Sequence, residues 1–421
     1  MASMRTHMRP LHTSLALFGL SHGSNSSLVE PAKAFDAKEN SKPPHLLSKV
    51  KKVYCLFVCC VLSLNVLRYI PSFWVGIDFV PHPTALRIVV LVWFIENAVS
   101  SIVLFVFFEN KNHFERYVQQ YITVISDDIS KYLKTNPACQ KAKRSMIRAL
   151  VVGWIIVIFN AVTVGFLLFS NLTPDVTVTL CNPLSHKSIP VKIFISVLFL
   201  LLSGVWVFPV VLHYSLTTAI EIRFQELHEV IENTALEDCP NRFETLKCVR
   251  YKHLQLCKMV ETVDQSLSYY VANVYLLSIG TACFLIYDLI SKVSGDPNIT
   301  EMIVSLFWLA SSFIIPFIIS IKSAKVHEKA HGLSSLIMDV NLDGATMQDL
   351  AHINLLVAKL HGPSIGLSVL GIITITKEMI LTHHHFTTKI KRNHSTHIND
   401  VIKNSNSMKL ANKIIIIILF S

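Results

Sequence analysis

The chain has 421 residues, of which 52% are hydrophobic and 16% are charged, and its mean hydropathy is +0.48. This composition is too apolar for a water-soluble globular protein. It excludes a secreted disulfide scaffold, a disordered protein and an ordinary cytosolic enzyme. The net charge of +10 is consistent with a membrane protein, because an excess of Lys and Arg marks cytoplasmic loops. We therefore expect a membrane protein with no nucleic-acid partner.

Six apolar stretches are long enough to cross the hydrocarbon core of a bilayer, which takes about 20 helical residues. The segment before the first stretch is rich in Lys and Arg, whereas the loop after it contains neither before Arg87. By the positive-inside rule, this asymmetry predicts a cytoplasmic N-terminus. The predicted fold class is all-α, a polytopic membrane protein with six transmembrane helices. The predicted spans are residues 53–75, 84–108, 147–170, 191–217, 269–290 and 302–321.

The segment between the fourth and fifth spans has helical periodicity. Ile220, Phe224 and Leu227 recur at helical spacing, as do Leu254 and Cys257, with charges between them. We therefore expect both spans to continue as helices into the cytosol, either packing only on each other or taking part in subunit assembly. The predicted organisation is a cytoplasmic N-terminal segment (1–52), a six-helix bundle (53–322) with cytoplasmic helical extensions around 218–268, a cytoplasmic segment that leads to an expected last span (323–382), and an atypical polar tail (383–421).

The glycosylation acceptors, the positions of the Cys residues and the N-terminal sequence agree with this topology. The glycosylation acceptors Asn171 and Asn298 fall in predicted outer loops, where the modification takes place. Of the nine Cys, only Cys181 falls in an outer loop, so we expect no disulfide framework. The apolar patch from Leu15 to Leu20 is too short for a signal peptide, and we interpret it as part of a cytosolic or interfacial segment.

Three patterns resemble catalytic or metal-binding motifs, and each lacks the context that its chemistry requires. The Gly-x-Ser-x-Gly sequence at 362–366 has no α/β sheet beneath it. Residues 339–344 open like a calcium-binding loop, but its twelfth position is Leu350 instead of Glu, which favours a polar turn that ends a helix. The His run at 383–385 has no acidic or Cys partner. We expect no catalytic residue, no metal site and no cofactor.

Polar and aromatic side chains inside the spans are candidates for a ligand site, because an ionisable group in a membrane must face a cavity, a partner or water. In the predicted orientation, several of them lie in the outer halves of the spans, where they would form an apolar pocket with a few polar groups. The alternative is that the aromatic residues form interfacial belts and that Glu96 pairs with a neighbouring helix. The candidates are Trp93, Glu96, Asn97, Asn160, Phe166, Trp206, Phe284, Tyr287, Phe307 and Trp308.

The order of these features resembles the insect gustatory receptors of the odorant/gustatory receptor superfamily. The clearest motif is residues 371–382, Gly-Ile-Ile-Thr-Ile-Thr-Lys-Glu-Met-Ile-Leu-Thr. It resembles the family's Gly-Phe-Phe-x-Ile-Thr-Arg-x-Leu-Ile-Leu-Thr stretch before the last span. The likeness covers residues 50–382. The motif residues are Gly371, Thr374, Thr376, Lys377, Leu381 and Thr382.

The resemblance implies a chemosensory (taste) receptor that detects a small-molecule tastant. In this family the polypeptide is a subunit of a ligand-gated, nonselective cation channel, assembled as a homo- or heterotetramer with other gustatory receptors. The resemblance also implies a multi-pass glycoprotein in contact with membrane lipid, in the plasma membrane of sensory neurons.

The residues after the motif differ from the family's last helix, which lines the ion pore. His383 to Arg392 are too polar to cross a bilayer, and the run from Ile414 to Phe420 is too short. We therefore expect a degraded or missing seventh helix, and the alternative function is a truncated receptor isoform that does not conduct. A seventh span at 364–382 also stays open, although charged residues interrupt it.

Two other classes of membrane protein are weaker alternatives. A G-protein-coupled receptor would have an outer N-terminus and an Asn-Pro-x-x-Tyr motif in its seventh span. A secondary transporter would have inverted repeats and broken helices. The sequence has none of these signals, so a receptor channel is the preferred interpretation.

Overall fold

The structure is a computed structural model, and it describes residues 2–21, 45–73, 81–109, 117, 120–121, 136–170, 174–181, 184, 187–236, 242–293 and 299–380. Six of its helices are long and apolar enough to cross a membrane. The prediction of an all-α polytopic membrane protein with six spans is confirmed. These helices are α2 (His45–Tyr69), α3 (Pro81–Glu109), α5 (Asn136–Phe169), α7 (Ile189–Leu236), α8 (Arg242–Val293) and α9 (Ile299–His331).

Each span is helical because an uninterrupted apolar run in a bilayer must satisfy its backbone polar groups within the segment. The first span illustrates how such a run ends. Its α-helix stops at Tyr69, before the predicted limit, and continues as the single 3₁₀ turn η3 (Ile70–Phe73). Pro71 lies in this turn, and its ring nitrogen has no hydrogen to donate to an α-helical ladder.

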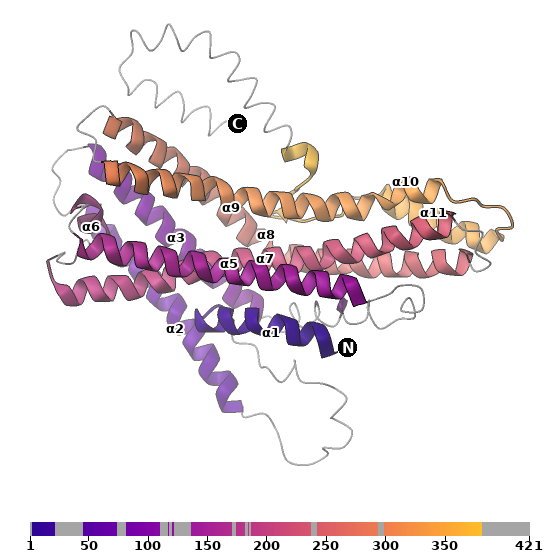
Figure 1. The fold of residues 1–421 in the computed structure, drawn as a ribbon, viewed down its shortest axis with the longest axis horizontal. Coiled ribbons are helices and arrows are strands. Elements are labelled where there is room, and N and C mark those ends of the chain that lie inside the picture. Colours follow the sequence, from indigo (N-terminus) through magenta and orange to yellow (C-terminus); the bar gives the residue numbers. More distant parts are fainter. Residues whose placement is uncertain are drawn as a thin grey trace, which may run out of the picture.

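The helix α7 is central to the bundle, where it packs against α3, α5, α8 and α9. Figure 1 shows α7, α8 and α9 as the long helices of the molecule, with the short α10 (Leu333–Met338) and α11 (Met347–Leu360) beside their far ends. The helix α7 continues past the predicted end of the fourth span to Leu236, and α8 begins at Arg242, well before the predicted fifth span; residues 237–241 lie outside the described residues.

The segment that resembles a calcium loop is a polar turn between α10 and α11. The Asp343 backbone N–H donates to Asn341 Oδ1 at 2.8 Å, and Gly344 takes the left-handed conformation at φ +78° that favours glycine. Among the described residues, no cluster of acidic, His or Cys side chains is arranged to hold a metal ion. The prediction of a polar turn at the end of a helix is confirmed.

The helix α11 is fixed at its first turn. Thr346 and Asp349 form a reciprocal capping box, in which each side chain accepts from the other's backbone N–H. Lys247 of α8 also reaches Asp349 Oδ1 at 3.2 Å. The hydrogen bonds from Thr346 and the neighbouring Lys247 ammonium hold the pKa of Asp349 below its usual range. This carboxylate therefore attaches α11 to the cytosolic end of α8.

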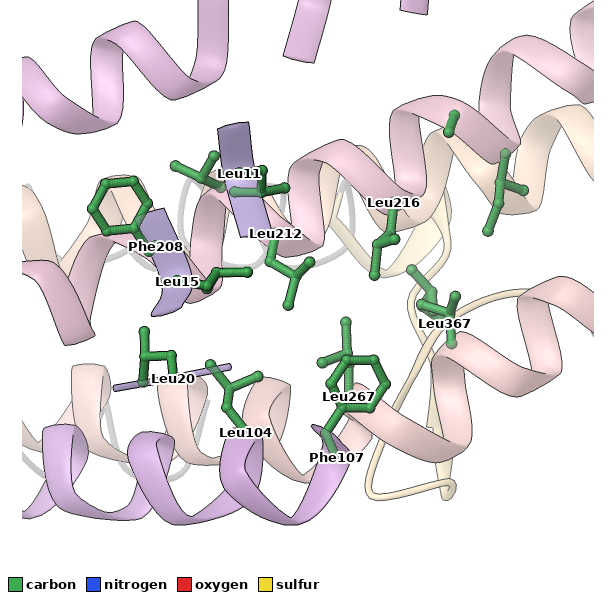
Figure 2. Close-up of a cluster of buried hydrophobic side chains, with 14 of the residues drawn as sticks. Leu11, Leu15, Leu20, Leu104, Phe107, Phe208, Leu212, Leu216, Leu267 and Leu367 are labelled. Atoms are coloured by element: carbon green, nitrogen blue, oxygen red, sulfur yellow. The ribbon is translucent and has the colours of Figure 1, made fainter. Parts of the chain in front are cut away.

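The N-terminal helix α1 (Ala2–Leu17) packs against α5 and α7. Figure 2 shows Leu11 and Leu15 directed toward Phe208 and Leu212 of α7, and all four side chains are buried. The sequence predicted a cytosolic or interfacial segment here. The structure adds that one face of this segment belongs to the core of the bundle.

The residue after α1, Phe18, inserts beside a glycine of α7. Its ring stacks on Phe208 at 5.2 Å between centroids and contacts the Trp154 ring at 5.6 Å. A Cβ atom at Gly204 would lie 2.1 Å from Phe18 Cδ1, which is far inside van der Waals contact. Because neighbouring aromatic rings hold Phe18, the site leaves no room for any side chain on Gly204.

We predict that Gly204→Ala destabilises the protein by about 1–3 kcal/mol, as overpacking of a tight core does. The measurement is the thermal midpoint of the detergent-solubilised protein. The matched control is Gly165→Ala in α5, where an added Cβ meets no atom within 4 Å. Alanine is the better helix former, so the control should be neutral or stabilising.

The double variant Gly204→Ala with Phe18→Leu should recover part of the lost stability, because the smaller side chain makes room for the methyl group. Equal midpoints for the two glycine variants would contradict the proposed packing of Phe18 on α7.

Candidate functional site

A cavity of about 50 Å³ lies between the transmembrane helices, in the half of the bundle that the charge bias places toward the outside. Side chains of α3, α5, α7, α8 and α9 form its walls, together with one from the short helix α6 (Pro174–Cys181). The lining residues are Val89, Val90, Trp93, Glu96, Asn160, Leu180, Phe199, Trp206, Ser278, Thr281, Phe307, Trp308, Ser311, Ser312 and Ile315.

Aromatic rings make up one wall of the cavity. The Trp93 ring lies 5.2 Å from Phe199 and 6.4 Å from Trp206, and it is nearly perpendicular to Trp206. On the opposite side, α9 contributes Phe307 and Trp308. Such rings offer large apolar faces in a fixed geometry, which is the usual character of a small-molecule site.

The polar groups of the cavity have defined partners. Asn160 Nδ2 of α5 donates to Ser203 Oγ of α7 at 2.6 Å, and this hydroxyl donates to the Phe199 carbonyl at 2.7 Å. The Trp206 indole of α7 lies beside the Glu96 carboxyl group of α3. These contacts join α5 and α3 to the same turn of α7 and orient the polar side chains at the cavity wall.

A second hollow, of about 310 Å³, lies between α5, α7 and α9 at the end of the bundle that the charge bias places toward the cytosol. It is larger, but charged side chains form much of its wall and some of them neutralise one another. Lys322 Nζ, for example, lies 2.9 Å from Glu221 Oε2. The smaller aromatic cavity is therefore the better candidate for binding a small organic molecule.

The sequence candidates divide into two groups. Those that line the cavity are Trp93, Glu96, Asn160, Trp206, Phe307 and Trp308. The other four lie outside its wall. Asn97 donates to the Trp93 carbonyl at 2.8 Å, Phe166 is 59% exposed on α5, and Phe284 and Tyr287 lie on α8 beyond the cavity.

Sequence reasoning missed the lining residues that carry no distinctive chemistry. On α8 the wall is made by Ser278 and Thr281, one turn before the aromatic pair that the sequence indicated. Small hydroxyl and aliphatic side chains recur throughout the spans, so only their position on the inner face of a helix could have identified them. The others missed are Val89, Val90, Leu180, Phe199, Ser311, Ser312 and Ile315.

The motif near residue 371 forms a β-hairpin. The strands β1 (Ser368–Val369) and β2 (Ile373–Thr374) pair antiparallel, and the Ile372 N–H donates to the Val369 carbonyl at 3.0 Å. Leu370 and Gly371 both have positive φ, +56° and +73°. This turn explains the glycine of the motif. It also means that a continuous seventh span over 364–382 is wrong, because the described part of that segment reverses direction.

The hairpin is fastened to α8 and begins another helix. Asp264 accepts hydrogen bonds from the Ser368 N–H at 2.6 Å and from the Ser368 hydroxyl at 2.8 Å. After the hairpin, Thr376 Oγ1 accepts from the Met379 N–H at 3.2 Å, as a helix N-cap does. Lys377 is exposed and lies 4.0 Å from Glu328. The motif thus ends a turn and starts a helix. Its last two residues, Leu381 and Thr382, lie outside the described residues. The predicted glycosylation acceptors Asn171 and Asn298 and the predicted tail also lie outside them.

The Gly-x-Ser-x-Gly sequence forms a loop that histidines of α9 hold. His331 Nε2 accepts from the Ile365 N–H at 2.9 Å, so its Nδ1 carries the proton and donates to the Leu360 carbonyl at 2.9 Å. His327 Nδ1 bonds the Ile365 carbonyl at 3.0 Å. Ser364 is exposed, and the Ser-His proximity is therefore a by-product of loop attachment.

The family model described as 7tm Chemosensory receptor matches residues 8–383. The chain belongs to this family of chemosensory receptors. The resemblance seen in the sequence began at residue 50, whereas the family match begins at residue 8, so most of the N-terminal helix α1 belongs to the matched region. The chain is therefore a receptor and not an enzyme.

Solved structures agree on the fold. The chain is similar to the insect olfactory receptor OR5 from Machilis hrabei, with a TM-score of 0.60 and 15% identity over 92% of this chain and 97% of that one. It is also similar to the same receptor in complex with eugenol, with a TM-score of 0.63 and 14% identity over 91% and 96% of the two chains. No curated protein matches the chain.

We predict opposite effects for two changes in the hairpin. Gly371→Ala should destabilise it by about 1–2 kcal/mol, because a Cβ disfavours the left-handed conformation. Leu370→Asn should stabilise it, because asparagine tolerates the positive φ that leucine adopts here. The measurement is amide hydrogen exchange of Ile372 and Ile375, whose N–H groups donate within the hairpin segment. Changes of the same sign would contradict the assigned turn.

Proposed function

We propose that the chemosensory receptor is a taste receptor subunit of a ligand-gated, nonselective cation channel, and that a small-molecule tastant binds in the aromatic cavity. The observation that carries this proposal is the cavity itself. It faces the predicted outer side, it is mostly apolar, and it contains a few oriented polar groups. This is the composition expected of a site that selects small organic molecules from outside the cell.

The family and the solved relatives support a ligand of this kind. The receptor OR5 from Machilis hrabei was solved in complex with eugenol, a small molecule with one aromatic ring. The cavity described here is small, so a ligand larger than a few atoms requires the side chains of its wall to shift. Phe307 is 39% exposed and is the aromatic lining residue with the most room to do so.

A single helix that connects the cavity to the C-terminal motif supports coupling of binding to gating. The helix α9 lines the cavity at Phe307 and Trp308 and continues, with Pro316 inside it, to His331. Its last two turns hold the loop before the hairpin through His327 and His331. A ligand that displaces α9 would therefore displace the segment that leads toward the expected last span.

The proposed setting follows the predicted topology. The receptor is a multi-pass protein of the sensory-neuron plasma membrane, glycosylated at Asn171 and Asn298, and it assembles as a homo- or heterotetramer with other gustatory receptors. The alternative of a truncated isoform that does not conduct depends on residues 383–421, which the structure does not describe. Both alternatives retain the cavity, so ligand binding and current have to be measured separately.

The test is a panel of sugars, bitter compounds and other tastants applied to cells that express the chain, alone or with candidate partner subunits. Phe307→Ala should reduce affinity for the active tastant about tenfold, because it removes an aromatic face from the cavity wall, and truncating an aromatic contact residue commonly costs more than about 1 kcal/mol of binding. Phe166→Ala is the matched control, since Phe166 is exposed and lies outside the cavity. It should leave affinity within about twofold of wild type.

Binding to the purified protein distinguishes the two functional alternatives. Ligand-evoked cation current supports the channel. Binding without current, from the chain alone and from every combination of partners, supports the non-conducting receptor. Binding that Phe307→Ala and Phe166→Ala weaken equally would contradict the proposed site.

A further inference from the structure

One residue makes the cavity acidic. Of the described side chains that line it, Glu96 is the only carboxylic acid, and none of these described side chains is a Lys, Arg or His. Glu96 is 5% exposed and lies in the middle of α3. Among the described residues, none of the ion pairs includes it. The cavity is therefore a site with one acidic group and no protein cation to balance it.

The described contacts hold this carboxyl group in place without pairing it with a cation. The Trp206 indole of α7 lies beside the carboxyl group. On the other side, Asn273 Nδ2 of α8 donates to the Glu96 backbone carbonyl at 3.3 Å and to Ser100 Oγ at 3.2 Å, which fixes this part of α3 against α8. Ionising a carboxyl group inside a bilayer is costly when no cation lies beside it. A positively charged ligand would remove much of that cost.

The aromatic residues around Glu96 are suited to the same kind of ligand. Trp93 lies one helical turn before Glu96 on α3, and its ring is nearly perpendicular to the Trp206 ring at 6.4 Å. Tryptophan is the aromatic side chain with the strongest attraction for a cation over its face. Two non-parallel indoles and a carboxylate form the arrangement that binds an ammonium group, with its apolar substituents against the rings and its charge near the acid.

We propose that the cavity selects cationic amines, with the ammonium group in the corner formed by the Trp93 and Trp206 rings and paired with Glu96. This inference rests on the proposed function, because it specifies the chemical class of the ligand in the same cavity. It distinguishes amines from sugars and neutral odorants of equal size, for which a buried carboxylate offers a hydrogen-bond acceptor but no charge attraction.

The test uses two probes that share one shape and differ in charge. Choline and 3,3-dimethyl-1-butanol differ by the replacement of the quaternary nitrogen with carbon. Their dissociation constants are measured on the purified full chain in nanodiscs by quenching of Trp fluorescence. We expect choline to bind wild type at least tenfold more tightly than the neutral alcohol.

Glu96→Gln should remove this preference, by weakening choline at least tenfold while changing the affinity of the alcohol less than about twofold. Glu301→Gln is the matched control, because Glu301 is also 5% exposed but lies outside the cavity. It should leave both affinities unchanged. The thermal midpoint of each variant reports whether it is folded, and Trp93→Leu provides a second route to weaker choline binding with the carboxylate intact.

The outcomes separate this inference from the proposed function. Equal or tighter binding of the alcohol to wild type, or a choline preference that survives Glu96→Gln, overturns the amine inference and leaves the cavity as a site for neutral ligands. Failure of both probes to bind also overturns the amine inference. The proposed function fails separately, if Phe307→Ala does not weaken the active tastant more than Phe166→Ala does.

Discussion

Inside a bilayer, a polar side chain needs a polar partner within the protein and a bulky side chain needs space to pack. One turn of α7 provides these for three side chains of neighbouring segments. Ser203 accepts from Asn160 of α5, Gly204 leaves room for Phe18 of the N-terminal segment, and the Trp206 indole lies beside the Glu96 carboxyl group of α3. The packing of the bundle and the chemistry of the cavity therefore depend on the same few residues. A change on this turn is expected to alter both stability and ligand recognition.

The position of the cavity follows from this arrangement. Because α7 is buried on most sides, the side chains that it directs toward α3 and α9 are shielded from lipid and able to contact a ligand. The helix α9 has a different role. It contributes Phe307 and Trp308 at one end, and near the other it holds the loop at Ile365 through His327 and His331. In the proposed function it is the mechanical link between ligand and channel.

The sequence predicted those properties that depend on long apolar runs and on charge. Six spans, and the continuation of two of them as cytosolic helices, could be predicted because hydropathy and helical period persist over many residues. It could not predict which side of each helix faces the cavity. Phe166 and Trp206 are both aromatic residues in the outer half of a span, yet only Trp206 faces inward, since neighbouring helices decide the rotation.

The packing of the N-terminal segment on α7 also could not be predicted from the sequence. Leu11, Leu15 and Phe18 form a short amphipathic pattern that is equally compatible with a membrane interface, and Gly204, the residue that accommodates Phe18, is distant in sequence. The hairpin at 368–374 was hidden because its motif was interpreted as the approach to a helix. Its only local signal was Gly371, whose positive φ the turn requires.

The most direct test of the account is a cryo-EM map of the receptor in nanodiscs, with a tastant that elicits a response. The account predicts ligand density between α3, α7 and α9, in contact with Trp93 and Trp206 and within reach of Glu96. A well-resolved map with ligand density elsewhere, and with these side chains packed as in the structure described here, would contradict it.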